Sequence, residues 1–394
     1  MLASVHDHGP ALVLGAGKAA AAMAAAFCAH WSGPVRGMVV TRYGHGLRQG
    51  ERAPGIDVVE AGHPSPDSAS VAAGTKLLEL ARGLQARESL YCLISGGGSA
   101  LAAVPLPGLA FEQKRAAADF LLRSGADIRE INCVRKHLSA LKGGRLARAA
   151  HPARVTTYAI SDVPGDDIAA IASGPTIPDP TTQADARRIL ERYAYPALAE
   201  LDAVLGDGIY ESPKPGDPSF ANDDARIIAS AATALTATAH WLRQEGYEVV
   251  YLGDDLDDEA RSLGRDHAEL AKRHSGSGVK TAILSGGETR VVLGKAGGRG
   301  GRNLEYLGAL ALALDGTAGV YALAADTDGI DGHGDHAGGM VTPDMLAVGA
   351  GRGVSLEALL ADHNSYQFFD VCDLLVRTGP TRTNVNDFRL ILCH

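Results

Sequence analysis

The feature that most constrains the fold is residues 93–100, which read Leu-Ile-Ser-Gly-Gly-Gly-Ser-Ala. An apolar run over residues 91–94 stops at Ser95, and three glycines follow before Ser99. This order predicts a buried strand whose carboxyl end opens into a loop of nearly bare backbone, with a helix after it. Such a loop leaves main-chain N–H groups open to an anion, which the helix dipole also favours. The candidate phosphate-binding residues are Ser95, Gly96, Gly97, Gly98 and Ser99. A strand-to-helix turn without a ligand is the alternative interpretation.

The same pattern returns late in the chain, where residues 283–289 read Ile-Leu-Ser-Gly-Gly-Glu-Thr. The expected second loop contributes three further candidate cofactor-binding residues, Ser285, Gly286 and Gly287. Two loops of this kind in two halves of the chain predict a cleft that binds phosphates.

The chain has 394 residues, which is long for one hydrophobic core. Strands alternate with helices in both halves, which is typical of parallel sheets with right-handed crossovers. We therefore expect an α/β fold with two Rossmann-like parallel-sheet domains and a cleft between them. Residues 206–221 contain Pro213, Pro215 and Pro218 and are the expected linker, so the predicted domains are residues 1–220 and 221–394.

A net charge of −9 argues against nucleic acid or an anionic membrane as the main partner, and we expect a small-molecule substrate instead. The five cysteines are scattered without a CxxC pair, which indicates a reduced protein without a disulfide framework. Residues 1–10 lack the apolar core of a secretory signal, and the longest apolar stretch, residues 19–28, is too short to span a bilayer. We expect a cytoplasmic protein, and an oligomer stays open.

The turn after the first predicted strand reads Gly-Ala-Gly-Lys-Ala-Ala over residues 15–20 and matches G-x-G-x-x-A, so Gly15 and Gly17 are candidate cofactor-binding residues. The second strand ends in Thr-Arg, where an NAD site favours an acidic residue. Lys18 at a helix N-terminus is unfavourable for the dipole unless it meets a phosphate or carboxylate. An exposed lysine without a ligand is the alternative.

Residues 127–146 are basic and amphipathic, and Asp127 is the expected helix N-cap. A run of this kind is usually a solvated helix face. Beside an anion site we expect Lys136 or Arg135 to lie near the cleft, while Lys142 and Arg145 are expected in solvent.

Aspartates follow two predicted strands, Asp162 and Asp166 after the first and Asp326 and Asp328 after the second. Carboxylates at the carboxyl ends of strands are suitable Mg²⁺ ligands, so these four are the candidate metal residues. Turns rich in Asp for local reasons are the alternative. An EF-hand is excluded because its twelfth position is Ala337 and a strand precedes the loop.

A glycine-rich segment, residues 295–303, carries three cations, and Arg302 stands at the start of the helix that follows it. Arginine on such a frame suits bidentate recognition of oxyanions. Residues 378–387 form a polar loop before a closing strand, and this loop contains Asn386.

Together these motifs resemble the D-glycerate 2-kinase family, whose C-terminal domain is called MOFRL. The matching stretches are residues 15–19, 62–67, 95–100, 132–146, 161–165, 173–182, 285–289, 298–303, 326–332 and 378–387. The resemblance implies phosphorylation of D-glycerate at the 2-hydroxyl with ATP and Mg²⁺, in a cleft between two α/β domains. It also implies that Lys18 and Arg302 are catalytic, and the candidate substrate-binding residues are Lys136 and Asn386. Arg382 and Leu304 depart from the family pattern.

Two other functions use the same residues. An NAD(P)H-dependent hydroxypyruvate reductase would use residues 15–20 as its cofactor turn, which leaves the other glycine-rich segments without a role. A non-catalytic sugar-acid binding protein would use the basic groups but gives no reason for aspartates at two strand ends.

Overall fold

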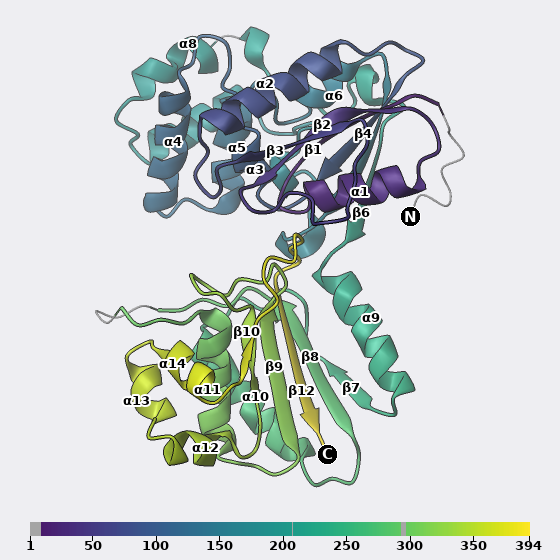
Figure 1. The fold of residues 1–394 in the computed structure, drawn as a ribbon. Helices are drawn as coiled ribbons and strands as arrows, with labels where there is room; N and C mark the ends of the chain where they lie inside the picture. The colour runs from purple at the N-terminus through teal and green to yellow at the C-terminus, as the bar shows by residue number, and fades with distance from the viewer. Residues whose placement is uncertain (1–8, 207, 293–296) are drawn as a thin grey trace. The chain divides into compact units, whose positions relative to one another are not determined.

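The computed structural model describes residues 9–206, 208–292 and 297–394, and the chain divides into two compact units, Met1–Ile228 and Ala229–His394 (Figure 1). Each unit is built on a six-stranded sheet, which confirms the α/β class with two such units. The first unit extends past the expected linker, because strand β6 (Asp224–Ala229) joins the first sheet. The predicted cleft between the two halves stays a prediction.

The first sheet has the strand order β3-β2-β1-β4-β5-β6, which is the order of a Rossmann-type doubly wound sheet. The pairs β1–β2, β1–β4, β2–β3 and β4–β5 are parallel, as expected. The remaining strands are β1 Ala11–Ala16, β2 Val35–Arg42, β3 Ile56–Ala61, β4 Ser89–Ile94 and β5 Arg154–Ile160.

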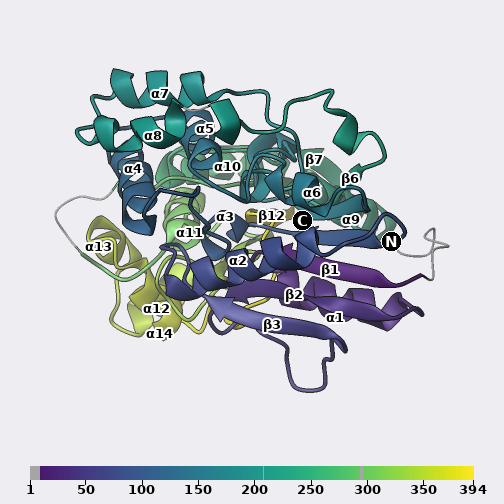
Figure 2. The same ribbon diagram turned by 90° about the horizontal axis from the view of Figure 1, so that it is seen from above.

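Helices cover both faces of this sheet (Figures 1 and 2). Alternate residues of β1 divide between the two layers: Val13 packs with α1, and Leu12 and Leu14 pack with α2 and α6. Helices α4, α5, α7 and α8 form a separate apolar cluster. Helix α5 begins after Asp127, whose side chain caps it as predicted. The helices are α1 Ala20–His30, α2 Ser68–Arg82, α3 Gly98–Leu101, α4 Phe111–Arg123, α5 Ile128–His137, α6 Arg145–Ala150, α7 Gln183–Arg192 and α8 Asp202–Leu205.

The second sheet has the order β11-β10-β9-β12-β8-β7 and is mixed. Strands β7 and β8 are parallel, whereas β12 is antiparallel to both of its neighbours, β8 and β9. The sequence predicts parallel strands throughout, and this prediction is wrong for the second sheet. The connection from β11 to β12 contains no crossover helix, and so short a loop joins antiparallel rather than parallel strands. The strands are β7 Glu248–Tyr251, β8 Thr281–Gly287, β9 Val320–Asp326, β10 Gly338–Val341, β11 Leu375–Val376 and β12 Asp387–Cys393.

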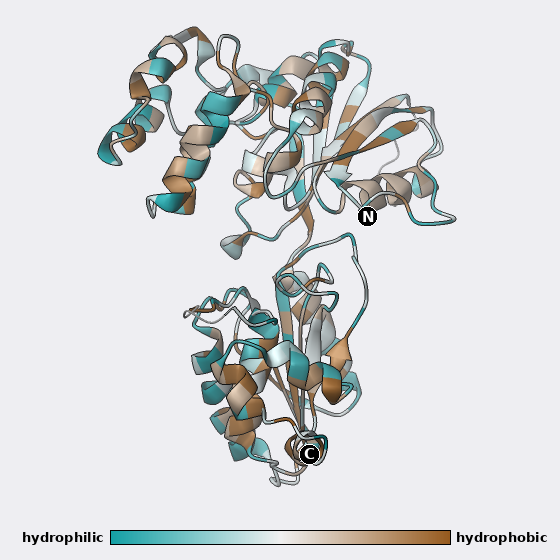
Figure 3. Cartoon of the chain, turned by 60° about the vertical axis from the view of Figure 1, so that its left-hand side comes forward, coloured by the Kyte–Doolittle hydropathy of each residue, from teal (hydrophilic) through white to brown (hydrophobic). Residues whose placement is uncertain are grey.

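The two faces of the second sheet are covered unequally. Helices α10 and α11 pack with the short helices α12–α14 on one face, and α9 packs on the other over β8. Apolar residues gather along the strands and on the helix faces turned to them (Figure 3). The helices are α9 Ala231–Gln244, α10 Ala260–His274, α11 Arg302–Leu314, α12 Met345–Gly351, α13 Leu356–Ala361 and α14 Ser365–Val371. None of the helices in the described ranges is both long and apolar enough to cross a membrane.

The register of the first sheet generates a prediction at Gly37. A Cβ there would overlap the carbonyl oxygen of Val13, its partner on β1. We expect Gly37→Ala to cost about 1–3 kcal/mol and to lower the unfolding temperature of the first unit by about 2 °C or more in calorimetry. Gly83→Ala is the control, because a Cβ at this helix end meets only ordinary contacts. Equal unfolding temperatures for both variants would contradict the prediction.

Candidate functional site

Strands β1 and β4 lie side by side in parallel, with Gly15 opposite Leu93 and Ala16 opposite Ile94. The strand order reverses between them, since the chain continues outward to β2 and β3 on one side and to β5 and β6 on the other. In open α/β sheets, ligands bind outside the carboxyl ends of the strands at such a point. The turn after β1 and the loop after β4 both begin there.

The turn after β1 has no main-chain donors left for a phosphate between residues 17 and 20. All four N–H groups donate to acceptors of the protein: Gly17 to Val40 O (3.1 Å), Lys18 to Gly96 O (2.9 Å), Ala19 to Ser95 Oγ (3.0 Å) and Ala20 to Gly17 O (3.1 Å). These are groups that a dinucleotide turn would offer to a pyrophosphate. Two of these bonds, from Lys18 and Ala19, hold the β4 loop in place.

Close packing explains the two glycines of this turn. A Cβ at Gly15 would lie 2.6 Å from Leu93 O, and a Cβ at Gly17 would overlap the hydroxyl of Ser95. Both positions need glycine so that the turn can approach the β4 loop. The cofactor-binding role of Gly15 and Gly17 stays a prediction.

The loop after β4 has the opposite character. Over the described ranges of the chain, the N–H groups of Gly96, Gly97 and Ser99 have no hydrogen-bond acceptor. Gly97 adopts a φ of 81° and precedes the single-turn helix α3. The loop thus presents open main-chain donors at the carboxyl end of β4, which is what an anion site requires.

Three side chains surround this loop. A Cβ at Gly97 would lie 2.9 Å from the His63 ring and 3.5 Å from Lys18 Cγ, and a Cβ at Gly96 would overlap the carboxylate of Asp162. The structure thus brings the candidates Lys18 and Asp162 to the predicted glycine loop. Asp166 lies in the short helix Pro164–Asp166, and within the described ranges no hydrogen bond or ion pair joins it to the loop.

The expectation of a second glycine loop is wrong. Ser285, Gly286 and Gly287 are the buried last residues of β8 and pair with β12. A Cβ at Gly287 would overlap the backbone of Leu256, so this glycine serves close packing. The local sequence pattern predicts that the strand ends at Leu284, because the pattern does not reveal the antiparallel neighbour β12, whose pairing extends β8 to Gly287.

Arg302, the first residue of α11, is held by three carboxylates. Its Nε donates to Asp387 Oδ1 (3.0 Å) and Oδ2 (2.9 Å), its Nη2 donates to Asp326 Oδ2 (2.6 Å), and its Nη1 lies 2.8 Å from Glu288 Oε1. β-Sheet register places Asp387 opposite both Asp326 and Gly287. The carboxyl ends of β8 and β9 and the start of β12 therefore converge on this guanidinium.

Buried polar residues fix the elements around Arg302 and its carboxylates in place. Asp331 accepts hydrogen bonds from the main-chain N–H groups of Asn303 and Leu304 at 3.2 Å and so caps α11. Arg389 donates to Ser285 Oγ (3.2 Å) and contacts Asp387 Oδ2 at 3.3 Å. Sequence reasoning missed Asp331, Asp387 and Arg389. The alternation of polar and apolar residues over 387–390 is the signal that could have placed Asp387 and Arg389 on one face.

The carboxylates of this cluster repel one another. Burial, with the charges of Asp328 and Asp387, raises the pKa of Asp326 to about 8. Burial also raises the pKa of Asp387, although Arg302 opposes the shift. Burial disfavours the charged form of Arg302, but the surrounding carboxylates of Asp387, Glu288 and Asp326 prevail and raise its pKa above its ordinary value. A cation bound beside these carboxylates would lower the repulsion between them.

The residues present fit a magnesium ion that arrives with phosphates. Across the described residues there is no group of three or more His, Cys, Asp or Glu side chains arranged for a metal. Mg²⁺ is commonly held by one or two carboxylates together with substrate phosphates and water, and Asp326 and Asp328 can supply that share. The main-chain N–H of Asp328 donates to Asp326 Oδ1 (2.9 Å), which keeps the two residues adjacent.

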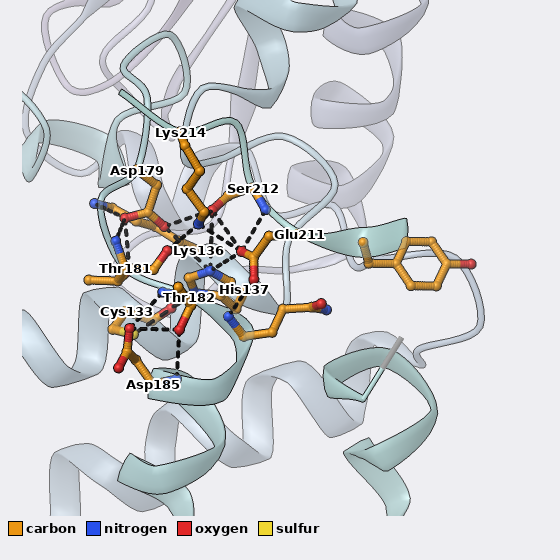
Figure 4. Close-up of polar contacts among 12 residues, drawn as sticks. Cys133, Lys136, His137, Asp179, Thr181, Thr182, Asp185, Glu211, Ser212 and Lys214 are labelled. Atoms are coloured by element: carbon orange, nitrogen blue, oxygen red, sulfur yellow. Dashed lines mark hydrogen bonds and ion pairs between the residues drawn. The ribbon is translucent and has the colours of Figure 1, made fainter. Parts of the chain in front are cut away.

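Lys136 and Asn386, the candidate substrate residues, already have partners within their units. Lys136 Nζ lies 3.4 Å from Asp179 Oδ1, in a network that also joins His137, Glu211, Ser212 and Lys214 (Figure 4). Asn386 is buried with a φ of 65°, and its carbonyl accepts hydrogen bonds from Thr327. Their substrate-binding role stays a prediction.

The expectation that Lys142 and Arg145 are solvated is wrong. Lys142 is buried, and its Nζ donates to Ser99. Arg145 donates to the carbonyl oxygens of Lys136 (2.8 Å), Lys142 (3.0 Å) and Tyr210 (2.7 Å). The main chain, rather than water, solvates both cations. Lys295, one of the three cations in the predicted glycine-rich segment, lies outside the described residues.

Comparison with known proteins gives two matching families. The family described as Domain of unknown function (DUF4147) matches residues 2–205, and the MOFRL family matches residues 281–387. A protein of Agrobacterium vitis with the provisional name hydroxypyruvate reductase is 48% identical over 390 residues, which cover 98% of this chain and 87% of that protein. The D-glycerate 2-kinase of Thermotoga maritima is 37% identical over 381 residues, which cover 95% of this chain and 89% of that enzyme.

A solved structure agrees with these sequence matches. The crystal structure of glycerate kinase from Thermotoga maritima superimposes with a TM-score of 0.90 at 35% identity, covering 99% of this chain and 92% of that one.

The burial of Asp326, together with the charges of Asp328 and Asp387, leads to a prediction about pH. The folded-state pKa lies above the ordinary value of 3.8, so the ionised carboxylate destabilises the fold increasingly as pH rises from about 4 to about 8. Asp326→Asn should therefore raise the unfolding temperature of the second unit by about 2 °C or more at pH 8, and by less at pH 5. Asp266→Asn, at an exposed position on α10, is the control. A gain that shrinks with rising pH would contradict the prediction.

Proposed function

Because the chain belongs to the glycerate kinase family that combines DUF4147 and MOFRL regions, we propose that it transfers the γ-phosphoryl group of ATP to the 2-hydroxyl of D-glycerate. The observation that carries this proposal beyond family membership is the contrast between the two turns at the switch point. The main-chain N–H groups of the β1 turn already donate hydrogen bonds to protein acceptors. In the described part of the chain, the N–H groups of Gly96, Gly97 and Ser99 in the β4 loop have no acceptor.

Phosphoryl transfer requires anion-binding donors, fixed cations and a divalent metal, with little covalent participation by the protein. The β4 loop with Lys18 supplies donors and a cation in the first unit. In the second unit Arg302 supplies a guanidinium whose orientation is fixed by Asp387. We assign Lys18 and Arg302 to stabilising charge on the transferring group, an interaction that strengthens toward the transition state.

Asp326 and Asp328 are the carboxylates that we propose for Mg²⁺, which would neutralise phosphate charge in the bound nucleotide. The mutual repulsion of Asp326, Asp328 and Asp387 supports this assignment, because a cation relieves it. Asp162 beside Gly96 is a further candidate, and Asp166 is the weakest of the predicted metal residues, since no hydrogen bond or ion pair joins it to the loop in the described part of the chain.

The reductase interpretation requires the β1 turn to bind a dinucleotide. Its N–H groups at residues 17–20 are engaged, and β2 ends in Thr41 and Arg42 without the acidic residue of an NAD site. These observations favour the kinase. A sugar-acid binding protein without catalysis would have no use for the crowded carboxylates around Arg302.

The proposal extends to a cytoplasmic enzyme whose partners are the nucleotide and a small hydroxy acid. All five cysteines are free thiols, and four of them are buried, which suits a reducing compartment.

One assay separates the three functions. The protein is incubated with D-glycerate, ATP and Mg²⁺, and the product is identified by ³¹P NMR as the 2-phosphate or the 3-phosphate. A parallel sample receives hydroxypyruvate and NADH, and absorbance at the nicotinamide band is followed. We expect 2-phosphoglycerate in the first sample and no NADH oxidation in the second. NADH oxidation without phosphoryl transfer would contradict the kinase assignment and support the reductase. No reaction in either sample would favour the binding protein.

Substitution of the two cations tests their role. Removing one preorganised electrostatic contact typically lowers turnover by about 10²–10³. Lys18→Ala and Arg302→Ala should each lower kcat by about that factor, and Arg302→Lys should recover only part of it, because an ammonium lacks the bidentate fork. Lys76→Ala, on the exposed face of α2, is the control. If both alanine variants raised only KM, the catalytic assignment would be wrong while the kinase remained.

A further inference from the structure

A buried lysine reaches the β4 loop from behind. Lys142 lies in the turn between α5 and α6, and only 2% of it is exposed. Its Nζ donates to the carbonyl oxygen of Ser99 and to Ser99 Oγ, the latter at 2.8 Å. Lys142 therefore holds both the main chain and the side chain of the residue whose N–H group is open to a ligand.

The hydroxyl of Ser99 continues into a chain of hydrogen bonds. Ser99 Oγ lies 3.0 Å from Ser173 Oγ, and Ser173 Oγ donates to Asn132 Oδ1 at 3.2 Å. Since Ser173 gives its proton to Asn132, Ser99 donates to Ser173 and accepts from Lys142. Each group in this chain has one defined role, so the orientation of Ser99 is fixed.

The backbone at Ser173 is strained in order to make this contact. Ala172 and Ser173 adopt φ values of 52° and 59°, a left-handed conformation that costs a non-glycine residue energy. Main-chain hydrogen bonds from the Lys142 turn hold the strained segment in place, Gly143 N to Ser173 O (3.1 Å) and Gly144 N to Gly174 O (2.8 Å). The same turn that carries Lys142 thus also positions Ser173.

Lys142 has no carboxylate partner over the ranges that the structure describes. The charged groups that influence it are Lys114 on α4 and Arg135 on α5, and burial together with these two cations lowers the pKa of Lys142 well below its ordinary value. A buried ammonium without a counter-ion is costly, and an anion beside it removes that cost. Lys142 therefore favours a negatively charged ligand at the N–H groups of the β4 loop.

We propose that Lys142 is a positioning residue, which fixes Ser99 so that the N–H groups of the β4 loop receive the anionic oxygens of a ligand. The ligand is a carboxylate of the hydroxy acid or a phosphate of the nucleotide, and its charge compensates Lys142. The inference rests on the proposed function for the identity of the ligands, but not for the presence of the anion site.

Lys114 provides a matched control. It is also a buried lysine, 7% exposed, its Nζ donates to a carbonyl oxygen, Val104 O at 2.8 Å, and burial lowers its pKa to about 7. It makes no hydrogen bond to the loop. Lys142→Met and Lys114→Met each remove one buried amine and keep a flexible apolar stem, so a general loss of stability is expected from both.

The experiment measures binding and turnover on the full chain. KM for D-glycerate and KM for MgATP are determined separately, and inorganic phosphate and D-glycerate are each titrated calorimetrically without turnover. We expect Lys142→Met to weaken binding of one of the two anions by about tenfold or more, because Ser99 loses the group that orients it and the anion loses a nearby cation, with kcat changed far less. The arm that changes identifies the ligand as phosphate or carboxylate. Lys114→Met should leave both KM values and both dissociation constants near the parental ones.

A second variant, Ser173→Ala, tests the same inference if Lys142→Met does not fold. Ser173→Ala removes the next link and should weaken the same anion by a smaller factor. Equal losses in Lys142→Met and Lys114→Met, or unchanged anion binding in Lys142→Met and Ser173→Ala, would overturn the inference. Weakened anion binding in Lys142→Met from a parent that transfers no phosphoryl group would support the inference and refute the proposed function alone.

Discussion

The first unit depends on the parallel pairing of β1 with β4 in a register that brings Gly15 beside Leu93. This register brings the β1 turn so close to the β4 loop that only glycine fits at positions 15 and 17. All four N–H groups of residues 17–20 are then engaged within the protein, and those of Lys18 and Ala19 hold the β4 loop. In this sheet of the Rossmann type, the open main-chain donors therefore lie on the loop after β4, one strand away from the turn that binds dinucleotides in other sheets of this type.

The two units offer opposite electrostatic environments. Behind the β4 loop, Lys142 is buried near other cations without a carboxylate partner in the described part of the chain. Around Arg302, three carboxylates share one guanidinium, and burial together with the charges of Asp328 and Asp387 raises the pKa of Asp326. Within the first unit the environment therefore favours a bound anion, and within the second unit it favours a bound cation.

Much of the fold and part of the site followed from sequence pattern. The apolar run before Ser95, the Asp127 cap and the strand before Asp326 are local signals, and the structure confirms all three. Lys142 was misplaced because helical periodicity assigns cations to solvent, whereas its burial depends on carbonyl and hydroxyl acceptors 43 residues away in the chain. Ser285 and its glycines were misplaced for a related reason, since strand direction and length depend on a partner, β12, that no local pattern reveals.

The place of β12 has a consequence for synthesis of the chain. This strand lies between β9 and β8 (Figure 1), and it is the last element of the second unit to be translated. Until residue 393 has left the ribosome, β8 and β9 each present an open edge, and Arg302 lacks the carboxylate that orients it. The first unit, complete by about residue 229, can fold well before that moment, while the nascent second unit keeps open strand edges that favour aggregation until β12 pairs.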